Sequence, residues 1–161
     1  MYEILKYFPL NIASIIDKKI KSSQDDLQEI RVRTNCPIIL KFNETEYILA
    51  GYIITYEDIM QIMQNICNNS IYSFQNEIIN GYITINGGHR VGITGSVVQE
   101  NGRVINIKNI SSLNFRIAKQ VLDCSNSVLK YIIDLKNNTI FNTLIVSSPG
   151  ARKNYFVKGF S

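Results

Sequence analysis

The amino-acid sequence predicts an α+β fold, with N-terminal helices, then an antiparallel sheet of hairpins with two or three helices, then the first strand of a second domain. Two patterns predict it: apolar residues recur at helical spacing near the start of the chain, and later runs alternate apolar with polar residues between polar turns. The 161 residues are 45% hydrophobic and 19% charged, which is typical of a globular chain with a real core.

The first elements are two short helices followed by strands. The helical spacing of the N-terminal apolar residues is interrupted by Pro9, which separates the helices. Leu27–Arg33 alternates apolar and polar residues, as a half-buried strand does. Ile38–Phe42 and Tyr47–Ile54 are joined by a short polar turn, which favours a β-meander.

Two helices are predicted next. The hydroxyl of Thr55 can cap a helix whose apolar residues, from Ile59 to Ile66, fall on one face. A second helix over Ser70–Ile79 ends before Gly81, because glycine suits the left-handed conformation that closes a helix.

Hairpins are predicted over the following forty residues or so, because Asn-Gly pairs supply the positive φ angles of tight turns. One turn contains Asn86, and the other is Asn101-Gly102. The predicted strands are Tyr82–Ile85, His89–Val98, Arg103–Ile107 and Leu113–Ile117.

A last helix through Leu129, Ile132, Ile133 and Leu135 closes the predicted first domain, which covers residues 1–138. Thr143–Val146 is then continuously apolar, as is a strand buried in a parallel sheet. Residues 139–161 are therefore predicted to begin a second domain.

Composition excludes several classes of site. The cysteines Cys36, Cys67 and Cys124 are widely spaced and the chain has a single histidine, so we expect buried, reduced thiols and no metal site. The net charge of +4 is mild and scattered, which gives little support to nucleic-acid binding. With no secretory signal and no apolar run near the length of a membrane span, the chain is expected to be cytoplasmic.

A degenerate phosphate-binding loop follows the apolar strand. The motif G-x-x-x-x-G-K-[ST] surrounds phosphates with backbone N–H groups and opens a helix with Lys and a hydroxyl residue. Here Ser147 and Arg152 stand at the glycine positions, and Asn154 stands at the hydroxyl position, so only the lysine matches. The candidate nucleotide-binding residues of this degenerate Walker A loop are Ser147, Ser148, Pro149, Gly150, Ala151 and Lys153.

The sequence after Ala151 is explained by a shifted reading frame. A plausible AT-rich coding sequence for Ala-Gly-Lys-Thr-Thr-Leu-Leu-Lys-Asp-Leu, with one A inserted after the alanine codon, encodes the observed residues Ala151–Ser161. The restored peptide is a complete P-loop, so we expect a frameshift after Ala151 and a P-loop ATPase domain as the second domain. A real frameshift, a pseudogene and a sequencing error all produce this pattern.

The chain resembles the stage III sporulation protein AA family over nearly its whole length. The blocks that carry the resemblance are Tyr72–Phe74, Gly81–Ile85, Gly87–Gly95, Ile110–Ala118 and Asn142–Ser147. The resemblance implies a protein similar to type II and IV secretion ATPases, with an α+β N-terminal domain before a P-loop ATPase domain. It also implies hexameric rings, ATP and Mg²⁺ as cofactors, and membrane proteins of the mother cell–forespore channel as partners, with the ATPase in the mother cell.

The departure from the family pattern after Ala151 implies that this chain alone binds no ATP and is an inactive, truncated ATPase. Arg90 and Arg116 could contact nucleotide or a neighbouring subunit, as N-domain arginines do in related secretion ATPases, or could simply be solvated strand residues. Two other functions stay open, which are an oligomerisation or assembly module and a small nucleic-acid-binding domain. The chain lacks the aromatic-basic strand motif of RNA-binding folds, which counts against the latter.

Overall fold

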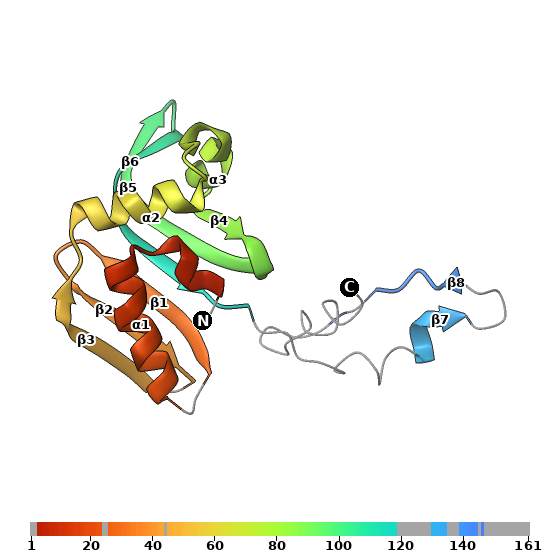
Figure 1. Cartoon of the computed structure of the whole chain (residues 1–161). Helices are drawn as coiled ribbons and strands as arrows, with labels where there is room; N and C mark the ends of the chain where they lie inside the picture. The colour runs from red at the N-terminus through yellow and green to blue at the C-terminus, as the bar shows by residue number, and fades with distance from the viewer. Residues whose placement is uncertain are drawn as a thin grey trace. The chain divides into compact units, whose positions relative to one another are not determined.

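The computed structural model of the chain describes residues 3–23, 26–43, 45–118, 130–134, 139–144 and 146 (Figure 1). Two compact units are present, Met1–Ala118 and Lys119–Ser161. The domain boundary predicted at residue 138 borders residues outside the described ranges, so it stays a prediction.

The first unit opens with the two predicted helices. The 3-10 helix η1 (Glu3–Tyr7) is followed by α1 (Leu10–Ser22), with Pro9 at the N-cap of α1 and a φ of −51°. Proline fits there because its φ is already fixed near the helical value and the first helical turn needs no N–H donor from it. The residues that α1 buries lie on one face and are Ile12, Ala13, Ile16 and Ile20.

A six-stranded antiparallel sheet forms the body of this unit, which confirms the predicted α+β class. Its strands are β1 (Leu27–Arg33), β2 (Pro37–Phe42), β3 (Thr45–Ile53), β4 (Tyr82–Ile85), β5 (His89–Glu100) and β6 (Arg103–Arg116). The spatial order is β3-β2-β1-β6-β5-β4. Two meanders, β1 to β3 and β4 to β6, are therefore joined through the antiparallel pairing of β1 with β6.

The predicted helix after Thr55 is α2 (Tyr56–Ile66), and it begins with a reciprocal capping box. The Asp58 N–H donates to the Thr55 hydroxyl at 3.1 Å, while the Thr55 N–H donates to the Asp58 carboxylate at 2.9 Å. The helix predicted over Ser70–Ile79 consists of a 3-10 turn, η2 (Ile71–Phe74), and a short α-helix, α3 (Gln75–Ile79).

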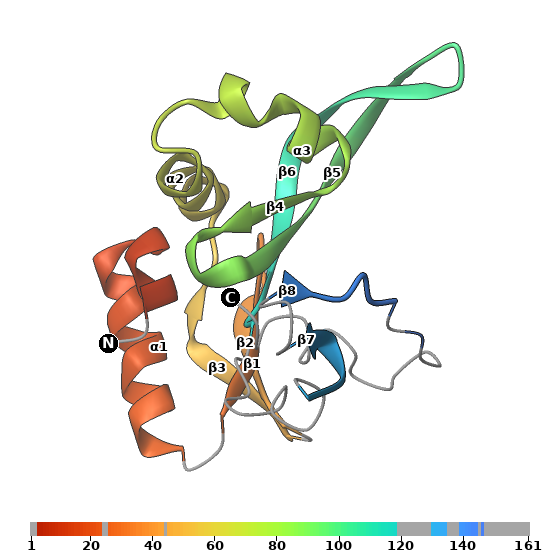
Figure 2. The same ribbon diagram turned by 90° about the vertical axis from the view of Figure 1, so that its right-hand side faces the viewer.

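One face of the sheet is covered by helices, and Figure 2 shows α1 and α2 on the same side of it. A row of fully buried side chains crosses this face from strand to strand: Ile30, Phe115, Val91 and Ile83 are directly paired neighbours. The Phe8 ring packs 4.7 Å from the Phe115 ring and anchors the N-terminal helices to that row. Because side chains alternate along a strand, the neighbouring residues point to the opposite face of the sheet, away from α1 and α2.

The two strands predicted within residues 103–117 are one continuous strand, β6, with a bulge where the break was predicted. Thr94 pairs with Ser112 and Ser96 with Lys108, so residues 109–111 of β6 lie opposite Gly95 alone. Asn109 takes a left-handed φ of 48° there. The polar residues around it therefore interrupt the apolar alternation without ending the strand.

In the second unit, residues 130–132 are helical, and β7 (Ile133–Asp134) pairs with β8 (Thr139–Ile140). The last predicted helix thus ends before Ile133, whereas the prediction carried it to Leu135, because Ile133 pairs with Ile140 in a ladder. The strand predicted over Thr143–Val146 does not form at its described residues, which have no regular structure. A parallel strand is held by neighbouring strands, and none pairs with these residues in the described part of the chain.

No helix in the described ranges is both long and apolar enough to cross a membrane.

Candidate functional site

Arg90 and Arg116 are the two candidate arginines of the sequence analysis. They are 26 positions apart in the chain, and they lie directly opposite each other in the β5–β6 ladder. Arg116 is also paired with Glu29 of β1, and Arg90 with Thr84 of β4. These residues alternate with the buried row described above, so they lie on the face of the sheet opposite α1 and α2, where both arginines are exposed. The fold therefore brings two guanidinium groups together at one place.

A third arginine of this face, Arg31, is already paired. Its Nε and Nη2 donate to the two carboxylate oxygens of Glu29, both at 3.0 Å, and its Nη1 donates to Glu46 at 2.9 Å. The hydrogen bonds from Arg31 are the main reason that the pKa of Glu29 is lowered, and the charge of Arg116 adds a smaller effect. Arg31 is thus a structural residue, while Arg33 is exposed at the end of β1.

Arg90 and Arg116, in contrast, have no carboxylate within ion-pair distance among the described residues. The guanidinium carbon of Arg90 lies 4.6 Å from the centre of the Tyr82 ring, an arrangement that holds the cation without neutralising it. Two neighbouring unneutralised guanidinium groups repel each other, and an anion that bonds to both removes that repulsion. The pair is therefore suited to phosphate or carboxylate.

Two polar residues of this face were missed by the sequence reasoning. Glu29 sits two residues before Arg31 on the same strand, so the alternation rule places both on one face and could have indicated their pairing. Asn114 pairs with Arg31 on one side and Gly92 on the other, and its side-chain oxygen is buried without a hydrogen bond within the described part. Nothing in the sequence indicates that neighbourhood, because it depends on the β1–β6 register.

His89 has a role that the sequence did not indicate. Its Nδ1 accepts a hydrogen bond from the Ala118 backbone N–H at 2.9 Å, which requires that nitrogen to be unprotonated. The ring also lies over Gly87, whose φ is +81° and where an added Cβ would come 2.9 Å from Nε2. His89 therefore fastens the last residue of the first unit to the β4–β5 turn.

The P-loop candidates Ser147, Ser148, Pro149, Gly150, Ala151 and Lys153 lie outside the described residues. Within those residues no group of three or more His, Cys, Asp or Glu side chains could hold a metal ion. Cys67 is buried, and burial, with a smaller effect of Glu77, raises the pKa of its thiol to about 11, so it stays protonated and unreactive at neutral pH.

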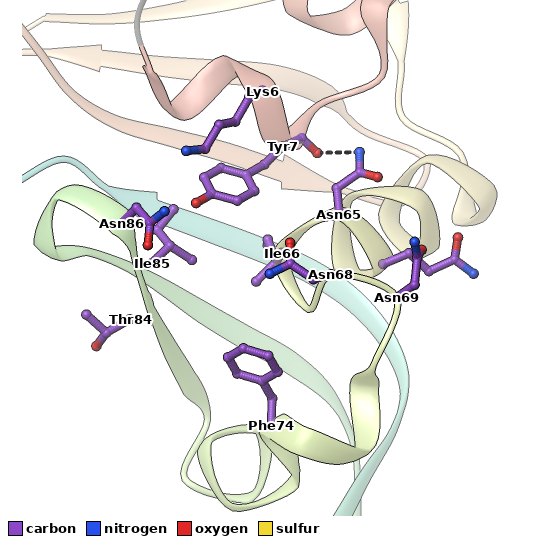
Figure 3. A pocket seen from close by; sticks show the side chains of 11 residues that line it. Lys6, Tyr7, Asn65, Ile66, Asn68, Asn69, Phe74, Thr84, Ile85 and Asn86 are labelled. Atoms are coloured by element: carbon purple, nitrogen blue, oxygen red, sulfur yellow. Dashed lines mark hydrogen bonds between the residues drawn. The ribbon is translucent and has the colours of Figure 1, made fainter.

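A cavity of about 470 Å³ lies elsewhere on the first unit, between η1, the end of α2 and β4 (Figure 3). In the view of Figure 3, Tyr7 and Phe74 lie at opposite ends, with Asn86 on one side and Asn68 on the other. No sequence pattern indicated this cavity, since its walls come from elements far apart in the chain.

The chain matches the sequence profile of a family described as "Sporulation stage III, protein AA" over residues 1–160. It belongs to this family. A curated member, stage III sporulation protein AA of Bacillus subtilis (strain 168), is 35% identical over 153 residues, which cover 95% of this chain and 48% of the relative. The chain therefore spans about half the length of that family member, and the resemblance inferred from the sequence is confirmed.

Solved structures similar to this chain include three ATPases, one of them from a type IV secretion system. The ATPase DotB of Legionella pneumophila matches with a TM-score of 0.42 and 10% identity, over 79% of this chain and 36% of that chain. DotB of Yersinia pseudotuberculosis gives a TM-score of 0.42 and 16% identity, over 72% and 31%. The VirB11 ATPase from the Brucella suis type IV secretion system gives 0.40 and 11%, over 73% and 34%.

Proposed function

We propose that this chain is the N-terminal module of a stage III sporulation ATPase, which works in the mother cell beside the membrane, at the channel to the forespore. Membership of the family over residues 1–160 carries the proposal. We further propose that the chain does not hydrolyse ATP by itself.

The loss of activity is expected from the residues at the P-loop positions. Hydrolysis needs a close approach of backbone N–H groups to the phosphates and a hydroxyl ligand for Mg²⁺. Arg152 places a Cβ and a long side chain where glycine is required, and Asn154 has no hydroxyl. Lys153 alone supplies one cation and cannot complete the site.

The two exposed arginines of the described residues are suited to a secondary role in nucleotide binding. Arg90 and Arg116 are adjacent and exposed, and neither forms an ion pair with a described carboxylate, so together they can donate to the oxygens of a terminal phosphate. The described residues provide no cluster of oxygen ligands for Mg²⁺, whose binding would fall to the P-loop domain. In a homo-oligomeric ring the pair would act on the nucleotide of its own subunit or of a neighbour.

An assay of phosphate release tests the proposal directly. The purified chain with ATP and Mg²⁺ is expected to release no phosphate above a buffer blank. Turnover that is removed by Lys153→Ala would refute the proposed inactivity, and the variant separates true activity from a contaminating ATPase.

An assembly module is the second candidate, and one surface favours it. The β5–β6 hairpin extends past the rest of the sheet (Figure 2), and Val97, Val104 and Ile105 on it are 52%, 37% and 42% exposed. Apolar exposure of this kind is typical of a surface that meets another protein. Co-elution of the chain with an intact family ATPase would support this function, and separate elution would exclude it. Nucleic-acid binding is less favoured, because Arg31 is already held by Glu29 and Glu46.

A further inference from the structure

We propose that the cavity between η1, the end of α2 and β4 binds an extended peptide segment of a partner protein, which adds a strand to the free edge of β4. This surface is separate from the arginine pair, and the inference does not depend on nucleotide binding.

The edge of the sheet at β4 is open to a further strand. β4 is the last strand in the spatial order, and its only paired neighbour in the described part is β5. The Ile93 N–H donates to the Gly81 carbonyl at 2.8 Å, so Gly81 and Ile93 are a hydrogen-bonded pair of the β4–β5 ladder. Hydrogen-bonded pairs alternate in an antiparallel ladder, so Tyr82 and Thr84 direct their backbone N–H and C=O groups away from β5. Such an edge is a template for an added strand.

The cavity lies beside this edge, because Thr84, Ile85 and Asn86 form one of its walls. The facing wall includes Asn68 and Asn69 at the end of α2. The side chains of these three asparagines make no hydrogen bond with any other residue that the structure describes. A carboxamide has the same donor and acceptor groups as a peptide unit, so asparagine can bond to both sides of a main chain.

The apolar part of the cavity can receive a side chain of the peptide. Tyr7 and Phe74 lie at its two ends, and Ile66 and Ile85 contribute to its walls (Figure 3). Successive side chains of an extended peptide point to opposite sides, so alternate residues of the added strand would face the cavity. A neutral polar rim around an apolar interior is the usual composition of a specific binding pocket.

The charge of the cavity favours a peptide over an anionic ligand. Lys6 is the one cation among the described lining residues, and its Nζ lies 3.0 Å from the Oε1 of Glu3. The other polar side chains of the lining are uncharged. The cavity is also held in shape before binding, because the Asn65 Nδ2 donates to the Tyr7 carbonyl at 3.0 Å and ties η1 to α2.

The test uses the chain itself and a library of synthetic octapeptides that alternate β-branched with polar residues. Binding peptides are selected, and their affinities are measured for the parent chain and for Asn68→Gly/Asn69→Gly and Asn86→Ala. Glycine is the suitable replacement at positions 68 and 69, since their φ angles are +48° and +61°. Each variant is expected to weaken binding about tenfold or more, the loss of roughly one pair of hydrogen bonds.

Asn101→Gly is the matched control, because Asn101 also has a left-handed φ, of +50°, but lies at the far tip of the β5–β6 hairpin. It is expected to leave peptide affinity unchanged. Hydrogen exchange provides a second readout that does not depend on any variant. The bound peptide should slow exchange of the Thr84 amide, which points outward, with little effect on that of Ile83, which bonds to β5.

Three results would overturn the proposal. One is the absence of any octapeptide that binds with a Kd below about 1 mM. Another is binding that protects no amide of β4 or is equally strong in the Asn68→Gly/Asn69→Gly and Asn101→Gly variants. The third is a response of the cavity residues to a neutral hexasaccharide without a response to peptides, which would assign the cavity to sugars.

Discussion

Replacing Gly95 by alanine should destabilise the first unit strongly, because the bulge of β6 crosses directly over this residue. A Cβ at position 95 would lie 2.6 Å from the Lys108 carbonyl oxygen and 3.1 Å from the Ile110 Cα. Both are backbone atoms, so they cannot move aside as the end of a flexible side chain can. The ladder on both sides of the bulge would have to shift to make room.

The expected cost is about 2 kcal/mol, within the range for inserting a methyl group into a packed site. For a unit of this size the slope of urea unfolding is about 1.5 kcal/mol per molar, so the midpoint should fall by about 1.3 M. The assay is urea unfolding followed by circular dichroism.

Two other glycines of the same sheet serve as controls. At Gly92, three residues earlier on β5, an added Cβ would meet only Asn114, at an ordinary 3.8 Å. At Gly51 on β3 it would meet nothing within 4 Å, so Gly51→Ala should raise stability by about 0.5 kcal/mol by restricting the unfolded chain. If Gly95→Ala unfolds at the same urea concentration as Gly92→Ala, the close crossing of the bulge is not required and this reasoning is wrong.

Three further outcomes are expected. Thr55→Ala should cost about 1 kcal/mol and lower the melting temperature by about 4 °C, since it removes half of the capping box of α2; an unchanged melting temperature would show that the cap contributes nothing. His89→Asn should keep hydrogen exchange of the Ala118 amide slow, because the Asn oxygen can take the place of Nδ1, whereas His89→Gln should make it fast; equal rates would contradict the fastening role. Arg31 lowers the pKa of Glu29 in the folded protein below its ordinary value of 4.5. The ionised carboxylate therefore contributes its full stabilisation above pH 4.5, and this contribution is lost as the pH falls through the folded pKa. The urea midpoints of the parent and of Glu29→Gln should converge between pH 6 and pH 3, and a constant difference between them would contradict this reasoning.

Most elements of the first unit could be predicted from local signals. Thr55 with Asp58 three residues later predicts the start of a helix, and the structure has both halves of that capping box. Asn101-Gly102 predicts a hairpin turn, and both residues have positive φ angles, of 50° and 74°. Each of these features depends on neighbours within a few positions, which is the range over which sequence patterns are informative.

The candidate sites could be predicted only in part, because they depend on register. Arg90 and Arg116 were recognised individually, yet their adjacency follows from the length of the β5–β6 hairpin, including its bulge. The hydrogen bond between His89 and Ala118 joins residues 29 positions apart, and no local pattern indicates it. The cavity beside β4 likewise combines segments whose positions the chain order does not determine.

The pairing of β1 with β6 has a consequence for how the chain folds as it is synthesised. Thr34 and Ser111, which are bonded at this seam, are 77 positions apart, and closing a loop of that length costs about 4 kcal/mol of chain entropy. The first meander must therefore wait, with one long edge unpaired, until the residues up to Arg116 have left the ribosome. During that interval the nascent N-terminal half is the form of the protein most exposed to aggregation.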